Sequence, residues 1–276
     1  MAFYGGSRIN TNVGALNALN ALNNVNSRIG VHQLRLSSGK RINSSADDPA
    51  GYTISQKLTA RSRCLSQALN NVGEAKNVLS VAEGGLQNIN DILVTVKEKM
   101  IQAGNGSYGD EELNAVLTQI NDLLNEVDDI IAETKFNGTQ LIDGNFTSKV
   151  FQTGADGGDS ITVNLSSTLD STTMGIGSLT TTDLSSVAAL SSVDSYIQTV
   201  SSELQDVGSL VQRLDYKETT LQVAITNTDA AASRIRDADV AKEQLELTKL
   251  QILQQTSTVQ LAQANAAPSN LLSLFR

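Results

Sequence analysis

The stretch ISQKLTARSRCLSQALNNVGEAKNVLSVAEGGLQNINDILVTVKEKMIQA, residues 54–103, carries apolar side chains at a spacing of seven. One column of this repeat is apolar throughout: Leu58, Leu65, Val72, Leu79, Leu86, Leu93 and Met100. A second column, three residues further on, is mostly alanine: Arg61, Ala68, Ala75, Ala82, Ile89, Val96 and Ala103. These are the a and d positions of a heptad repeat, and they predict one helix about 75 Å long at ~1.5 Å per residue. The small d residues allow a partner helix to approach closely.

Two further stretches supply helices that can pack along this one. Residues 193–235 carry renewed heptads, and residues 113–131 carry apolar residues in a 4-3-4-3-4 rhythm after a glycine-rich turn at 104–109. Because that turn is short, the helix at 113–131 is predicted to fold back antiparallel on the long helix. The seam residues expected to hold the three helices together are Leu58, Leu65, Leu79, Leu86, Leu93, Ile120, Leu124, Leu204, Val211 and Leu221.

Both ends of the chain are predicted to be amphipathic helices with more apolar surface than one partner covers. Residues 9–36 carry two neighbouring heptad columns, and residues 245–266 carry an apolar column with further leucines beside it. Soluble monomers rarely leave such surface uncovered, so we expect further copies of the chain to cover it. The residues assigned to this assembly are Leu22, Val25, Ile29, Leu36, Leu245, Ile252, Val259, Leu261, Leu271 and Phe275.

The region between these helices has a different character. Residues 136–165 alternate apolar and polar side chains between glycine-rich turns, which predicts short strands and hairpins. Residues 166–192 are dense in Ser and Thr with few charges, which is typical of a surface-exposed connector. The predicted fold class is therefore mainly α: a long antiparallel coiled-coil helical bundle with a small β-hairpin region in the middle of the chain.

Composition argues against several classes of function. The net charge of −9 disfavours nucleic-acid binding, because phosphate contacts need clustered Lys and Arg. Cys64 is the only cysteine, and no His or second Cys lies beside it to activate the thiol. His32 is the only histidine, and no second ligand is spaced near it, so an interface residue is favoured over a metal or catalytic one. We expect no cofactor and no enzymatic activity.

No stretch of about 18 apolar residues is present, so no transmembrane span is predicted. The N-terminal sequence MAFYGGSRINTNV lacks the apolar core of a secretory signal peptide. The expected location is therefore the cytoplasm, unless the chain is exported by a route that needs no cleaved signal.

The chain resembles the bacterial flagellins, in a short form that lacks the outer variable domains. The resemblance rests on segments at both ends and between them: INTNVGALNALNALNNV from Ile9, LRLSSGKRINSSADDPAGYTIS from Leu34, KFNG from Lys135, FQTGA from Phe151, RIRDADVAKE from Arg234 and QANAAPSNLLSLFR from Gln263. It implies a structural subunit that polymerises into the helical flagellar filament for swimming motility. It also implies an extracellular location, after export through the flagellar type III apparatus without a cleaved signal peptide.

The resemblance further implies a division of the chain. In flagellins the terminal helices form an inner coiled-coil tube and the long helices form an outer shell. The implied segments are 1–40 and 239–276 for the two halves of the inner domain, 41–137 and 193–238 for the two halves of the outer core domain, and 138–192 for the β-hairpin and Ser/Thr-rich connector. The implied partners are further copies of the chain, a flagellar export chaperone at the C-terminal helix, and filament cap and hook-associated proteins, with no nucleic acid and no membrane.

One set of positions departs from the family. Flagellins detected by the innate receptor Toll-like receptor 5 share an Arg and a Leu four residues apart on the long helix, and a Glu on the following helix. Counted without gaps from the shared FNG, these positions hold Thr95, Lys99 and Gln119 in this chain. Arg is typical of binding hot spots, and Lys99 places a charge where an apolar contact is wanted. Weak or absent recognition by that receptor is expected.

Three alternatives remain open from sequence. A hook–filament junction protein would share the flagellin-like termini, although the ending LLSLFR and the match across both long helices favour a flagellin. An enzyme displayed on a filament is disfavoured, because no HExxH motif is present and one histidine cannot build the usual zinc site. A cytoplasmic coiled-coil scaffold would leave the hairpin region and the paired apolar termini unexplained.

Overall fold

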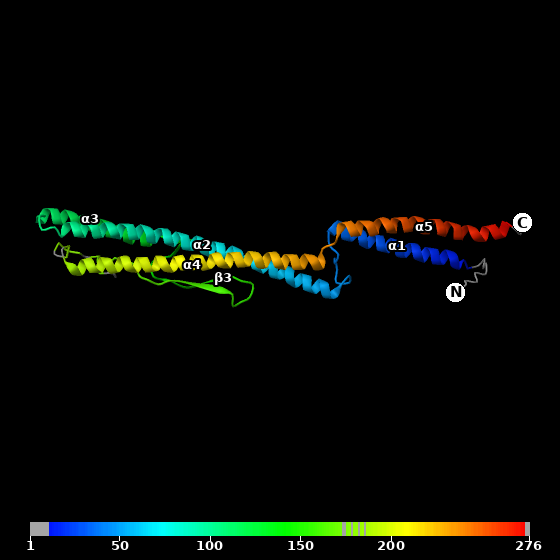
Figure 1. The fold of residues 1–276 in the computed structure, drawn as a ribbon, viewed down its shortest axis with the longest axis horizontal. Helices are drawn as coiled ribbons and strands as arrows, with labels where there is room; N and C mark the ends of the chain where they lie inside the picture. The colour runs from blue at the N-terminus through cyan, green and yellow to red at the C-terminus, as the bar shows by residue number, and fades with distance from the viewer. Residues whose placement is uncertain (1–10, 173–174, 178, 182, 185, 274–276) are drawn as a thin grey trace. The chain divides into compact units, whose positions relative to one another are not determined.

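The computed structural model describes residues 11–172, 175–177, 179–181, 183–184 and 186–273, together with their side chains except at 187 and 267–273. Most of these residues are helical (Figure 1). The elements are α1 (Val13–Ser38), α2 (Pro49–Ala103), α3 (Asp110–Glu133), β1 (Lys135–Phe136), β2 (Thr139–Gln140), β3 (Phe146–Gln152), β4 (Ser160–Leu165), α4 (Val187–Arg236) and α5 (Val240–Ser273). The predicted fold class, long paired helices with small hairpins in mid-chain, is confirmed.

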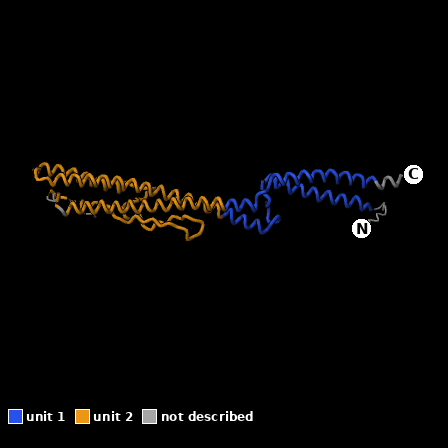
Figure 2. The backbone as a smooth tube through the Cα atoms, in the orientation of Figure 1, with its two compact units in different colours: residues 1–60, 228–276 blue, residues 61–227 orange. Residues whose placement is uncertain are grey.

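The chain divides into two compact units, drawn in different colours in Figure 2. Unit 1 contains residues 1–60 and 228–276, and within it α1 packs against α5. Unit 2 contains residues 61–227, and therefore most of α2 and α4 together with α3 and both hairpins. The large apolar core lies in unit 2, and a much smaller one lies between the terminal helices.

The core of unit 2 follows the heptad columns of α2. Leu65, Leu79, Leu86 and Leu93 are buried, and the alanines and β-branched residues of the second column are buried beside them. Leu58, which precedes unit 2, is half-buried, and Arg61 at the start of the second column is exposed. A side chain as small as alanine leaves room for neighbouring backbone, which is why a column of them permits a dense seam. The core therefore coincides with the periodicity that defines the helix.

α4 runs antiparallel to α2 along this seam. Lys97 of α2 pairs with Asp194 near the start of α4 at 2.5 Å, whereas Lys76 pairs with Asp215 at 2.6 Å and Glu218 at 2.9 Å, further along α4. The pKa of Lys76 is raised, first by its hydrogen bond with Asp215 and then by that with Glu218. The face of α4 that is most completely buried is a column at a spacing of seven: Val193, Val200, Val207, Leu214 and Leu221. Leu204 and Val211, which the sequence assigns to the seam, are half-buried and pack against the same core.

α3 returns along α2 (Figure 1) and completes the core with one apolar stripe. Its first turn holds three acidic residues, which suit the positive end of the helix dipole. Glu112 also accepts a hydrogen bond from the backbone N–H of Gly109 at 3.0 Å, and so satisfies a donor ahead of the helix. The buried stripe comprises Val116, Ile120, Leu124, Val127 and Ile131.

Two small antiparallel hairpins follow α3. β1 and β2 are joined by Asn137 and Gly138, whose φ angles of 49° and 80° lie in the left-handed region. A two-residue turn with positive φ at both positions is the type I′ turn, for which Asn-Gly is the preferred sequence. β3 and β4 form a longer hairpin with an irregularity between Phe146 and Lys149. Burial alternates along β4, so one face of this hairpin packs on the core and the other faces solvent.

The segment after β4, residues 166–172, is anchored to two helices by polar side chains. The backbone N–H of Ser167 donates to Glu203 of α4 at 3.1 Å, and the Tyr196 hydroxyl, also on α4, donates to the carbonyl oxygen of Leu169. Asp128 of α3 accepts from both the backbone N–H of Ser171 at 2.9 Å and its hydroxyl at 2.6 Å. Alternate residues of this segment are thus hydrogen-bonded to helices: Ser167 and Leu169 to α4, and Ser171 to α3.

This anchoring corrects the interpretation of residues 166–192 as a surface-exposed connector. Leu169, Ile176 and Leu184 are buried in the main core, so the Ser and Thr residues lie between apolar side chains that pack inward. Burial raises the pKa of the Tyr196 phenol, and the charges of Asp128 and Asp170 raise it further. Tyr196 is therefore the hydrogen-bond donor to Leu169 across the ordinary pH range.

Glu203 offers a test of the anchored segment. Its carboxylate is buried, and Oε2 has no hydrogen-bond partner among the described residues, so Ser167 is its only polar contact there. We expect Glu203→Leu to leave the Ser167 N–H without an acceptor and to lower local stability by about 1–3 kcal/mol. Amide hydrogen exchange at residues 166–171 should accelerate accordingly, relative to the wild type. Asp206→Leu, at an exposed position on the same helix, is the matched control; equal exchange in both variants would contradict the anchoring role.

Candidate assembly surface

The two terminal helices pair antiparallel in unit 1 (Figure 1). The Asn12 side-chain amide donates to the carbonyl oxygen of Ala264 at 2.6 Å near one end. Further along, the Gln254 amide donates to the Asn26 side chain at 2.7 Å. Between these helices lies a small core that consists of Ile29, Leu247 and Leu250, with Val25 and Leu36 packed against it.

A charged cluster closes the other end of this pairing. His32 Nδ1 of α1 contacts the Glu243 carboxylate of α5, and Arg35 lies 3.5 Å from the second Glu243 oxygen. Glu243 is buried, so these two contacts replace the water that its carboxylate would otherwise bind. His32 was predicted to be an interface residue, with no second ligand spaced near it in the sequence. Its carboxylate neighbour lies 211 residues away, where no local spacing rule could find it.

The segment between α1 and α2 is tied to the junction between α4 and α5. Gly39 adopts the left-handed conformation that ends α1, with a φ of 68°. Its carbonyl oxygen accepts from the backbone N–H of Ala238 at 2.9 Å, and the Arg41 N–H donates to the Arg236 carbonyl oxygen at 2.7 Å. Backbone hydrogen bonds from Ser44, and then Asn43, lower the pKa of Asp47 within this segment. The terminal helices therefore end in an ordered, backbone-bonded junction.

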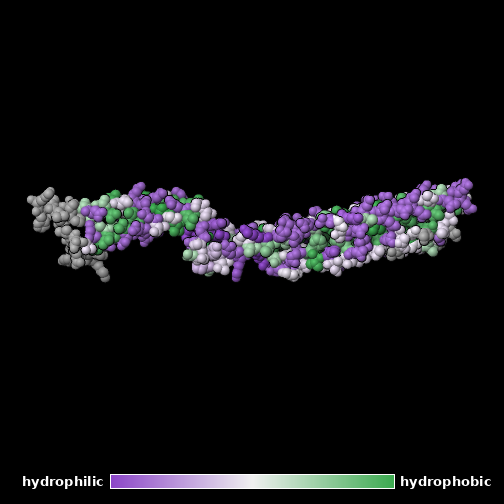
Figure 3. Space-filling view, turned by 180° about the vertical axis from the view of Figure 1, so that it is seen from behind, coloured by the Kyte–Doolittle hydropathy of each residue, from purple (hydrophilic) through white to green (hydrophobic). Residues whose placement is uncertain are grey.

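α5 presents a second apolar stripe that α1 does not cover. Leu245, Ile252 and Val259, at a spacing of seven, are 72%, 59% and 65% exposed. The stripe that faces α1 lies on another side of the helix and includes Leu247, Leu250 and the half-buried Leu261. α1 also exposes large apolar residues: Val13, Leu16, Leu19, Val31 and Leu34. Leu16 and Leu19 border an open pocket that Leu261 of α5 also lines. Figure 3 shows hydrophobic residues at the surface of this helix pair.

The residues assigned to assembly therefore fall into two groups. Ile29 is buried between the terminal helices, and Leu22, Val25, Leu36 and Leu261 are half-buried. The second group is the exposed stripe on α5, Leu245, Ile252 and Val259, which does not pack against α1. The side chain of Leu271 and all of Phe275 lie outside the described residues. Sequence periodicity predicted one wide apolar face on α5, and it could not decide which part of that face lies against α1.

The receptor-patch positions lie on α2 and α3 of unit 2. Thr95 is half-buried, and its hydroxyl donates back to the Asp91 carbonyl oxygen of the same helix at 3.0 Å. Lys99 is half-buried and Gln119 is exposed. All three positions are thus at the surface of the two helices, where a partner can reach them.

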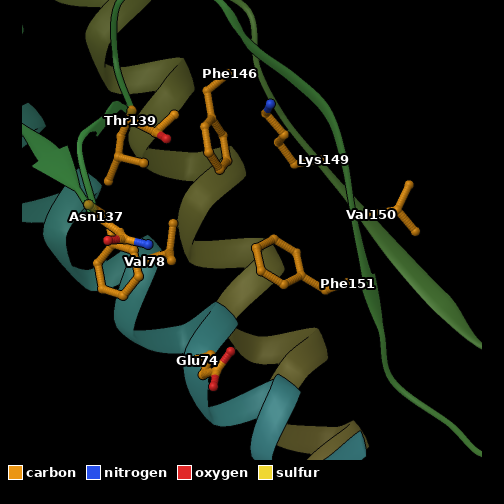
Figure 4. Close-up of a pocket in the computed structure, with 10 residues that line it drawn as sticks. Glu74, Val78, Asn137, Thr139, Phe146, Lys149, Val150 and Phe151 are labelled. Atoms are coloured by element: carbon orange, nitrogen blue, oxygen red, sulfur yellow. The ribbon is translucent and has the colours of Figure 1, made fainter.

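An open pocket lies between α2 and the two hairpins (Figure 4). Phe146 and Phe151 of β3 face it, together with Val78 of α2, while Glu74 and Lys149 lie at its edges. The walls are mainly apolar, and Lys149 stacks over the Phe146 ring, 5.7 Å from its centroid. The residues that line this pocket do not bring an acid, a base and a nucleophile together. We therefore interpret the pocket as a gap in the packing of the hairpins against α2, not as a catalytic site.

The described part of the chain holds neither a metal centre nor a membrane-spanning helix. No group of three or more His, Cys, Asp or Glu residues there is arranged to hold a metal ion. No described helix is both long and apolar enough to cross a bilayer. Cys64 is exposed on α2. The surface feature that remains is the exposed apolar side chains of α1 and α5, which another protein chain could cover.

Comparison with known proteins agrees with this geometry. Residues 9–147 match the bacterial flagellin N-terminal helical region, and residues 190–275 match the flagellin C-terminal helical region. The chain is 36% identical to a flagellin of Bacillus subtilis (strain 168), covering 98% of this chain and all of that one. It is 33% identical to flagellin FlaB1 of Treponema pallidum (strain Nichols), covering 97% and 99% of the two chains.

A solved structure shares the fold at low sequence identity. A candidate flagellar hook-associated protein from Vibrio parahaemolyticus superposes with a TM-score of 0.58 at 14% identity, over 69% of this chain and all of that one. This likeness speaks for the fold alone, since hook-associated proteins and flagellins cannot be separated by it. Sequence identity over nearly the full length separates them. The chain belongs to the flagellin family, whose members are the non-enzymatic structural subunits of the bacterial flagellar filament.

Proposed function

We propose that the exposed stripe of Leu245, Ile252 and Val259 is buried between copies of the chain in the filament. The observation that carries this proposal is their exposure on a helix whose other apolar stripe is already occupied by α1. A helix that is apolar on two sides needs two sets of neighbours. A helical polymer supplies them, because head-to-tail contacts repeat along the assembly without closing.

The size of the effect supports assembly at modest concentration. Full burial of one large aliphatic side chain stabilises by about 1.5–3 kcal/mol, so three of them contribute about 4–9 kcal/mol per subunit. Lost translational and rotational freedom opposes association by a similar amount. The apolar residues that α1 exposes, and contacts of unit 2, would supply the remainder.

We also propose the division of the chain implied by the family resemblance. Residues 1–40 and 239–276 would form the inner coiled-coil domain of the filament. Residues 41–137 and 193–238 would form the outer core domain, with 138–192 as its hairpin region. The pairing of α1 with α5 supports the first part, and the shared core of α2, α3 and α4 supports the second. The compact units place the boundaries differently, at 60 and 228.

Replacing the exposed stripe with polar residues should abolish polymerisation. Glutamine is a good helix former, so Leu245→Gln, Ile252→Gln and Val259→Gln together should keep the monomer helical while removing apolar area. The expected result is no filament by negative-stain electron microscopy, with unchanged helical circular dichroism. Removal of residues 245–276 should likewise leave a soluble monomer that does not polymerise.

The matched control lies one residue earlier along the same helix. Gln244, Gln251 and Thr258 share the spacing of seven and are exposed, but they are polar. Gln244→Ala, Gln251→Ala and Thr258→Ala together should polymerise as the wild type does. Filaments formed by the glutamine variant at the wild-type yield would rule out the proposed interface.

We propose, further, that proteins other than the chain itself use the same stripe. A flagellar export chaperone would cover it before assembly, and filament cap and hook-associated proteins would contact the terminal helices at the ends of the polymer. The glutamine variant should bind a purified export chaperone at least about tenfold more weakly, since 1.4 kcal/mol already corresponds to that factor. Titration calorimetry on the full-length monomer measures this, and equal affinity of both proteins would contradict a shared surface.

The fourth proposal concerns innate recognition. With Thr95, Lys99 and Gln119 in place of the Arg, Leu and Glu of recognised flagellins, the receptor would meet no guanidinium hot spot and would have to desolvate an ammonium group. We expect purified monomer to give at least about a tenfold weaker Toll-like receptor 5 reporter response than the variant Thr95→Arg, Lys99→Leu, Gln119→Glu. A robust receptor response to the unaltered monomer would disprove the proposal of weak recognition.

A further inference from the structure

Two Asn-Gly dipeptides lie at the surface of unit 2, in different backbone settings. Asn105–Gly106 lies in the loop between α2 and α3, and Asn137–Gly138 forms the turn between β1 and β2. All four residues are exposed. An asparagine that precedes glycine is open to attack by the next backbone nitrogen, because glycine has no side chain to obstruct it. We propose that Asn105 is a site of spontaneous deamidation in the folded protein and that the hairpin protects Asn137.

The reaction needs only water and base. The backbone nitrogen of Gly106 gives up its proton and attacks Cγ of Asn105, forming a new C–N bond. The bond from Cγ to Nδ2 breaks, and ammonia leaves with the proton, so that a five-membered succinimide remains. Water then opens this ring at either carbonyl carbon. Cleavage at Cγ gives aspartate, and cleavage at the backbone carbonyl carbon gives isoaspartate, in which the main chain runs through Cβ and Cγ.

The loop leaves the reacting atoms of Asn105 accessible. Among the described residues, the Gly106 N–H and the Asn105 side-chain amide make no hydrogen bond, so neither is held away from the other. Two bonds of 3.2 Å order the local backbone: the Asn105 N–H donates to Gln102, and the Asn105 carbonyl oxygen accepts from Tyr108. Both lie at the long end of the ordinary range. The conformational freedom that ring closure requires is therefore available without breaking secondary structure.

The hairpin holds Asn137 in the wrong geometry. Its φ of 49° and the 80° of Gly138 are fixed by strand pairing on both sides, Phe136 with Thr139 and Lys135 with Gln140. Ring closure brings Cγ and the following nitrogen into one five-membered ring, so the backbone must leave the turn conformation. A further hydrogen bond of 3.1 Å, from the Leu141 N–H to the Thr134 carbonyl oxygen, also resists opening. Reaction at Asn137 thus requires prior opening of the hairpin.

Deamidation at Asn105 would change the loop in two ways. It adds one negative charge next to the acidic first turn of α3, in a chain whose net charge is already −9. The isoaspartate product also lengthens the connection between α2 and α3 by one backbone atom. Both changes concern a loop that carries none of the residues proposed for assembly.

The test is peptide mapping of full-length monomer aged in mildly alkaline buffer at physiological temperature. Mass spectrometry follows the loss of each asparagine, and a protein isoaspartyl methyltransferase labels the isoaspartate. We expect Asn105 to react at least about tenfold faster than Asn137, equivalent to 1.36 kcal/mol of opening free energy. In denaturant, the two rates should become similar.

Gly106→Ala is the matched variant. A β-carbon at Gly106 meets no atom within 4 Å, and its φ is outside the left-handed region, so this variant should fold normally. It should slow reaction at Asn105 by about tenfold, through steric obstruction of the attacking nitrogen, and leave Asn137 unchanged. Equal rates at the two sites in the folded protein, faster loss at Asn137, or no reaction at Asn105 would each overturn the proposal.

Discussion

Close packing along one face of α2 is the constraint on which the rest of unit 2 depends. A column of leucines and a column of alanines lie side by side on that face, and both are buried almost throughout. Interiors pack as densely as organic crystals, so a run of small side chains fixes how near the neighbouring helix must lie. α4 meets this face with a column of valines and leucines, and α3 and the hairpins cover what remains. α3, α4 and the hairpins are therefore all positioned by their packing against this face of α2.

Polar residues then determine where the non-helical part of unit 2 is placed. Tyr196 and Glu203 stand seven residues apart on α4, in a buried column where the neighbouring positions are Ala189 and Leu210. A buried carboxylate is unfavourable unless it is hydrogen-bonded, and Glu203 has an available donor in the backbone of Ser167. The interaction favours one position of residues 166–172 over an apolar surface that would accept several. These two side chains therefore fix where the segment lies as well as stabilise it.

Periodicity predicted the helices, their antiparallel arrangement and most of the core, because residues such as Leu79 and Leu93 repeat at a spacing that only a helix satisfies. It could not predict the role of Glu203, since a charged residue in a heptad column is ordinarily assigned to the solvent side. The pairing of His32 with Glu243 was inaccessible for another reason: nothing local relates residues so far apart. The sequence predicted one wide apolar face on α5, so only the structure separates Leu247, which faces α1, from Leu245, which does not.

The pairing of the first helix with the last has a consequence for the order of folding. Contacts between residues 211 positions apart require the closure of a very long loop, and the entropy of closure grows with the logarithm of loop length. Topologies rich in such non-local contacts fold slowly. Once α2 and α4 have paired, most of the intervening chain is already immobilised and the remaining closure is short. The terminal pair is therefore the natural last step, and its small core leaves it the first part of the molecule to open.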